Sequence, residues 1–138
     1  MKIEPQEIHI WQTELSLTPE QAEEKLTLLS QDEYERAVRY RFNTHRHRYI
    51  ASRSFLRQIL GLYLDVDQKS IDFLYSEYKK PYVLPNHHSI QFNLSHSDNL
   101  AILACTQNHA IGVDVEKEQY EYKEDVAKRF LVLWKTLN

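Results

Sequence analysis

The sequence predicts an α+β fold in which helices pack against an antiparallel sheet. Two observations carry this prediction: helix-start signals with helical apolar spacing over residues 18–64, and three short apolar stretches joined by tight turns over residues 91–117. A length of 138 residues and a hydrophobic fraction of 42% suit a single hydrophobic core. We therefore expect one α+β unit.

The first expected element is a strand over residues 7–13, where the alternation in EIHIWQT turns Ile8 and Ile10 toward the core. Two helices follow, over residues 18–29 and 30–41. Each opens on a hydroxyl residue with a glutamine or glutamate three positions later, which is the pattern of a capping box.

A third helix is expected over residues 45–64. Its apolar face should pack on the sheet, because six residues recur at helical spacing: Tyr49, Phe55, Leu56, Ile59, Leu60 and Tyr63. At about 100° per residue, Arg46, Arg53 and Arg57 form one stripe on this helix. The stripe is either a solvated face or part of a phosphate site, since guanidinium groups bind phosphate in a bidentate way.

Charge is distributed unevenly along the chain. Residues 1–35 contain nine acidic side chains, whereas residues 36–57 contain seven arginines and no acidic residue. The basic block indicates a phosphorylated ligand. Nucleic acid would also fit an arginine-rich block, but the acidic first segment argues against a nucleic-acid partner.

A short strand is expected over residues 70–74, and the last of the three strands within 91–117 ends in a carboxylate pair. Asp114 and Glu116 are two residues apart, so their side chains share one face while the flanking valines turn to the other. Two adjacent carboxylates suit a hard cation such as Mg²⁺, or else Mn²⁺.

The alternative to a metal site is a pair of exposed carboxylates at the end of a strand. Gly112 favours the metal site, because it permits close approach of another backbone or a ligand. In the turn expected between two strands, Ser95 and His96 offer groups that can take a phosphate oxygen, although an ordinary polar turn would look the same.

Other features limit the class of protein. Cys105 lies in the apolar run LAILAC and is expected in the core. No apolar run approaches the roughly 20 residues of a membrane span, and the N-terminus does not resemble a signal peptide, so a cytoplasmic protein without a membrane partner is expected. Residues 126–137 predict an amphipathic helix, and the apolar cluster at 130–137 suggests a partner surface or self-association.

Four stretches, taken in order between about residues 33 and 130, resemble the Sfp-type 4'-phosphopantetheinyl transferases. They are ERAVRYRFNTHRHRYIASRSFLRQIL, EYKKP, FNLSHSDN and IGVDVE. Each stretch is common by itself, but the ordered combination is specific. The resemblance implies one αβ pseudo-repeat of that family over residues 1–110 and the start of a second over residues 111–138.

Members of this family transfer 4'-phosphopantetheine from coenzyme A to a serine of an acyl or peptidyl carrier protein. The resemblance implies that Asp114 and Glu116 hold Mg²⁺ against the coenzyme A pyrophosphate. It also implies that coenzyme A is contacted by Asp114 and by Arg36, Arg48, Tyr75, Lys79, Lys80, Asn93, Ser95 and His96. Among the arginines of the third helix, the resemblance thus favours Arg48 as a coenzyme A contact over the stripe of Arg46, Arg53 and Arg57.

The chain departs from the family pattern at three places. Lys79 and Asp98 stand where the family has glycine. Residues 118–138 lack the family's Lys-Glu-Ser segment, whose glutamate completes the metal site, so the catalytic residues stay unassigned. We expect a second half shortened by truncation, frameshift or fragmentation, with impaired catalysis. The alternative is a non-catalytic module that binds coenzyme A or a carrier protein and needs a complementing partner.

Overall fold

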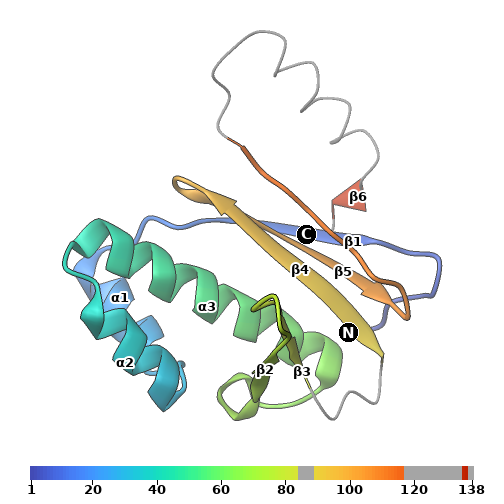
Figure 1. Ribbon diagram of the computed structural model, residues 1–138, viewed down its shortest axis with the longest axis horizontal. Helices are drawn as coiled ribbons and strands as arrows, with labels where there is room; N and C mark the ends of the chain where they lie inside the picture. The colour runs from blue at the N-terminus through green and yellow to red at the C-terminus, as the bar shows by residue number, and fades with distance from the viewer. Residues whose placement is uncertain (84–88, 117–134, 137–138) are drawn as a thin grey trace, which may run out of the picture.

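The computed structural model describes residues 1–83, 89–116 and 135–136. In chain order the elements are β1 (His9–Glu14), α1 (Pro19–Leu26), α2 (Gln31–Arg39), α3 (Asn43–Leu64), a 3-10 turn η1 (Gln68–Ser70), β2 (Phe73–Tyr75), β3 (Pro81–Val83), β4 (Ile90–Ser97), β5 (Leu100–Gln107) and β6 (Lys135–Thr136). The predicted α+β class is confirmed, with helices packed on a mainly antiparallel sheet (Figure 1).

The main sheet has the strand order β4-β5-β1-β6, and β2 and β3 form a separate hairpin. β5 pairs antiparallel with both β4 and β1, whereas β6 pairs parallel with β1. No helix among the described residues is both long enough and apolar enough to cross a membrane.

Both predicted capping boxes are present. The Thr18 hydroxyl accepts from the Gln21 amide and the Gln21 side chain accepts from the Thr18 amide, at 3.1 and 2.9 Å. Ser30 and Glu33 make the same reciprocal pair at 3.3 and 2.9 Å. These bonds satisfy amides that a helix start leaves unpaired, which fixes where α1 and α2 begin.

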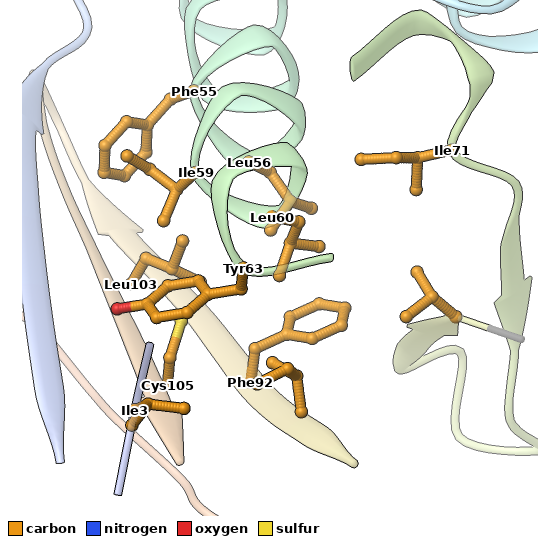
Figure 2. Packing of buried hydrophobic residues seen from close by; sticks show 12 residues of the cluster. Ile3, Phe55, Leu56, Ile59, Leu60, Tyr63, Ile71, Phe92, Leu103 and Cys105 are labelled. Atoms are coloured by element: carbon orange, nitrogen blue, oxygen red, sulfur yellow. The ribbon is translucent and has the colours of Figure 1, made fainter. Parts of the chain in front are cut away.

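The long helix α3 packs on one face of the main sheet, as its apolar spacing predicts. Figure 2 shows Phe55, Ile59 and Tyr63 directed toward the strands. On the sheet side, Leu103 and Cys105 are fully buried. The expectation that Cys105 is a core residue is confirmed, and burial raises the pKa of its thiol to about 12.

The first strand begins two residues later than expected, and its inward set differs. Ile10 is buried, but Ile8 precedes the strand and is 40% exposed, so its predicted core position is wrong. His9 is buried instead. Its Nδ1 lies 2.5 Å from the Tyr63 hydroxyl, which also accepts from Trp11 Nε1 at 2.8 Å. Because both faces of β1 are covered, simple alternation could not identify the inward residues.

The expected third strand after β5 is not formed. Residues 111–116 form no strand ladder with β4 or β5. After β5 the chain turns back, and these residues run extended across the sheet (Figure 1). Ile111, Val113 and Val115 pack on the opposite face of the sheet from α3, against Ile10 and its neighbours. The alternation of Val113 and Val115 therefore reflects packing of this segment on the face of the sheet, and not hydrogen-bonded pairing as a further strand of the sheet.

Two further expectations need correction. The strand predicted at residues 70–74 is formed only from Phe73 onward, as β2, because Ser70 ends the 3-10 turn. Its partner β3 was missed because it begins at Pro81. The predicted helix over residues 126–137 is contradicted at Lys135–Thr136, which form β6. The rest of that helix and most of the 130–137 cluster lie outside the described residues.

Candidate functional site

The carboxylate pair lies on the extended segment 111–116. Its side chains alternate as predicted: Asp114 and Glu116 are exposed, while Val113 and Val115 are half-buried against the sheet. The packing of the valines thus presents both carboxylates on the outer side of the segment.

Side chains of β4 attach this segment to the sheet. The Val113 amide donates to Asn93 Oδ1 at 2.8 Å, and the Val115 amide donates to Ser95 Oγ at 3.1 Å. Ser95 Oγ also donates to Asp114 Oδ1 at 3.4 Å. Asn93 and Ser95 therefore lie beside Asp114, and both already have protein partners.

The donor set fits Mg²⁺, although the site is small. Mg²⁺ is commonly held by one or two carboxylates together with waters and substrate phosphates. Asp114 and Glu116 supply two such carboxylates. Within the described parts of the chain, no group of three or more histidine, cysteine, aspartate or glutamate residues could hold a metal ion.

Gly112 was expected to permit the close approach of another backbone or a ligand. A Cβ at this position would meet no heavy atom within 4 Å, and its φ is not positive. No described backbone approaches the Cβ side of Gly112, and the approach of a ligand there stays a prediction.

Two cationic side chains of the predicted set are attached near β4. Lys80 Nζ donates to the Ile111 carbonyl at 3.3 Å, which places an ammonium group at the start of the carboxylate segment. Arg48 Nε donates to Asn99 Oδ1 at 3.0 Å, in the loop between β4 and β5. His96 is exposed on β4 close to that loop; the prediction that Ser95 and His96 lie in the turn is wrong, because β4 continues to Ser97. Cations thus flank the strand that carries Asn93 and Ser95.

The other predicted contacts are less closely associated with this strand. The Arg36 guanidinium lies 5.4 Å from the Tyr49 ring centre, on the helical side of the molecule. The Tyr75 hydroxyl accepts from Arg53 Nη2 at 3.0 Å. Lys79 is exposed in the turn between β2 and β3, with a positive φ of 63°.

The arginine stripe of α3 is not a phosphate site. Glu33 is buried and its two carboxylate oxygens each lie 2.6 Å from a guanidinium nitrogen, one of Arg53 and one of Arg57. Arg46 donates to the Tyr40 carbonyl at 2.6 Å. Helical spacing correctly placed the three arginines on one face, but their partners are protein groups.

Sequence reasoning missed a groove between the β2–β3 hairpin and β4. Its volume is about 440 Å³, and its lining includes Ser76, Lys80, Tyr82, Gln91 and Asn108. No sequence signal marked Gln91 or Asn108, because the groove arises from how the hairpin packs. The Asn93 and Ser95 attachments had a signal: polar residues alternate with the apolar residues Ile90, Phe92 and Leu94 along this strand.

The match to known proteins covers most of the chain. The sequence profile described as 4'-phosphopantetheinyl transferase, N-terminal, matches residues 11–108. The chain belongs to the 4'-phosphopantetheinyl transferase family. The resemblance seen in the sequence motifs is thus confirmed.

Individual relatives agree with this assignment. The chain is 38% identical over 130 residues to the 4'-phosphopantetheinyl transferase HetI of Nostoc sp. (strain PCC 7120), covering 91% of this chain and 54% of that protein. It is 30% identical over 116 residues to the 4'-phosphopantetheinyl transferase Sfp of Bacillus subtilis (strain 168), covering 83% and 50%. This family member therefore spans about half the length of the curated relatives it matches.

Proposed function

We propose that this chain binds coenzyme A with Mg²⁺ and takes part in transferring 4'-phosphopantetheine to a carrier-protein serine. The observation that carries the proposal is the Asp114 carboxylate, attached to β4 through Ser95 and exposed beside Glu116. The relatives are named phosphopantetheinyl transferases, which supports the same reaction class.

In this proposal the carrier serine oxygen attacks the phosphorus bonded to pantetheine, and the bond to the nucleotide phosphate breaks to release 3',5'-ADP. A bound Mg²⁺ would supply charge neutralisation for the diphosphate. Asp114 and Glu116 would hold it. Arg48, Lys80 and His96 would bind and orient the nucleotide phosphates, with Arg36, Tyr75 and Lys79 as further contacts. The serine proton has no assigned acceptor among the described residues.

The second candidate function is binding without turnover. It is favoured by the two-carboxylate donor set, since the described residues provide no third acid for the metal. The chain would then be a module that binds coenzyme A or a carrier protein and needs a complementing partner for turnover, and the boundary at residue 110 stays a prediction.

Calorimetry with coenzyme A and Mg²⁺, followed by mass spectrometry of an apo carrier protein, tests both candidates. We expect Asp114→Ala to remove most of the Mg²⁺-dependent affinity for coenzyme A. Asp32→Ala, which changes an exposed acid at the start of α2, is the matched control. A mass increase of the carrier by one phosphopantetheine group indicates transfer, and binding of coenzyme A without that increase indicates the binding module. No binding by the unmodified chain contradicts both.

A further inference from the structure

Hydrogen bonds to side chains of β4 hold the segment that carries the carboxylates. In a paired strand, backbone hydrogen bonds would do this. Asn93 and Ser95 are on the same face of β4, two residues apart. They accept from the amides of Val113 and Val115, which are also two residues apart. This equal spacing fixes the register of the segment, so that Asp114 lies between the two attachment points.

Ser95 makes a second contact that bears on its role. A serine hydroxyl has one proton and two lone pairs. Ser95 Oγ uses one lone pair for the Val115 amide at 3.1 Å and directs its proton to Asp114 Oδ1 at 3.4 Å. In this structure the Ser95 hydroxyl thus serves the segment and its carboxylate, whereas the family resemblance implied a contact with a phosphate oxygen.

We infer that Asn93 and Ser95 are positioning residues for the Asp114 carboxylate, and that Ser95 is not a phosphate ligand. This inference rests on the proposed function for its metal, but the attachment itself does not. Val113 and Val115 bury one side of the segment against Ile10 and Ile102. The two hydrogen bonds from their amides keep the segment from sliding along the sheet. The carboxylate is thereby held in place before any ligand binds.

Amide hydrogen exchange tests the attachment without any ligand. Asn93→Ala should speed exchange at Val113, and Ser95→Ala at Val115, each by about fivefold or more, because one hydrogen bond is lost. Ser95→Thr keeps a hydroxyl and should keep slow exchange. Ser97→Ala is the control, since Ser97 lies on the same face of β4 and is not bonded to the segment. Unchanged exchange at both valines in the alanine variants overturns the attachment.

Two ligand probes separate positioning from phosphate binding. For 3',5'-ADP without divalent ions, Ser95→Ala should bind within about twofold of the unmodified chain. For coenzyme A, the gain in affinity on adding Mg²⁺ should fall about tenfold or more, as is typical when a partner of a metal ligand is removed. In the Asp114→Ala background the same change should have no further effect.

Other outcomes overturn one proposal or the other. A loss of 3',5'-ADP affinity in Ser95→Ala, with or without Asp114, shows that Ser95 binds phosphate. A full Mg²⁺ effect in Ser95→Ala shows that it does not position Asp114. If the unmodified chain binds neither probe, the proposed function and the metal role fail together, while the exchange result still decides whether the attachment exists.

Discussion

The carboxylate of Glu33 and the guanidinium of Arg57 form a buried ion pair between α2 and α3, with 2.6 Å between Oε1 and Nε. Arg57 Nη1 also donates to the carbonyls of Gln68 and Ile71, at 2.8 and 2.9 Å. The second oxygen of Glu33 pairs with Arg53 Nε. Glu33 thus joins α2 to α3, and Arg57 joins both to the loop that leads into β2.

Removing Glu33 should strongly destabilise the fold. Glu33→Ala leaves two inward arginines without their counter-charge, and breaking a buried pair in this way costs about 3–5 kcal/mol. The measurement is the midpoint of urea unfolding at constant slope. Glu35→Ala, an exposed change on the same helix, should stay within about 0.5 kcal/mol. Equal losses in the two variants would contradict a structural role for the pair.

The same network should make stability depend on acid pH. Burial alone would raise the pKa of Glu33, but the Ser30 amide and the charges of Arg53 and Arg57 outweigh it and hold the pKa below its ordinary value of 4.5. As the pH falls, the unfolded chain therefore binds a proton at Glu33 before the folded chain does. The stabilisation is complete above the unfolded-state pKa and is lost as the pH falls through the lower folded-state pKa.

This effect can be isolated with Glu33→Gln, which has no proton to bind at this position. The difference in free energy of unfolding between the original chain and the variant should be constant from about pH 7 to pH 5.5 and shrink toward pH 3. A difference that stays constant over the whole range would show that the pKa is not lowered by folding.

Two residues at glycine positions of the family adopt the left-handed conformation. Lys79 has a φ of 63° and Asp98, in the loop between β4 and β5, a φ of 51°. This conformation costs a side-chain-bearing residue about 1–2 kcal/mol, less for aspartate than for lysine. Lys79→Gly should therefore raise the free energy of unfolding by up to about 1 kcal/mol; the gain is limited because glycine also has more entropy to lose on folding.

Thermal unfolding at neutral pH measures these changes. Lys69→Gly is the matched control, because Lys69 lies in the η1 turn and is not among the residues with positive φ. It should lower stability. If Lys79→Gly lowers stability as much as Lys69→Gly does, the left-handed backbone at residue 79 is not a source of strain.

Local chemistry explains which elements could be predicted from the sequence. The Thr18 and Ser30 caps act within four residues, and the core face of α3 follows from its own spacing, so each signal is contained in one stretch. The register of residues 111–116 depends instead on Asn93 and Ser95, which are 20 residues away. Alternation in IGVDVE could not distinguish a paired strand from a segment lying across a sheet.

The candidate site shows the same division. The sequence identified Asp114 and Glu116 as neighbours, because two residues on an extended chain share a side. It could not say whether the arginines of α3 contact a ligand or Glu33, since the helix period determines a direction and not the partner found there. The groove beside β4 likewise could not be predicted, because it depends on how the β2–β3 hairpin packs beside β4.

Arg46 and Arg48 allow these two readings of the basic helix to be compared directly. Arg46 Nη2 donates to the Tyr40 carbonyl at 2.6 Å, so its guanidinium is used inside the protein. Among the described contacts of Arg48, only its Nε donates a hydrogen bond, to Asn99. We expect Arg48→Ala to lower coenzyme A affinity about tenfold or more, because a charged hydrogen bond to phosphate is worth roughly 1.5–3 kcal/mol, with little change in stability.

Arg46→Ala should give the opposite pattern. Removing it frees the Tyr40 carbonyl, which should cost about 1 kcal/mol of stability, while coenzyme A affinity stays within about twofold. Calorimetric titration gives the coenzyme A affinity of each variant, and urea unfolding gives its stability. Because phosphate contacts weaken with salt, the affinity difference for Arg48→Ala should also shrink as ionic strength rises. Equal affinity losses in the two variants would mean that the arginines act only through the net charge of the helix.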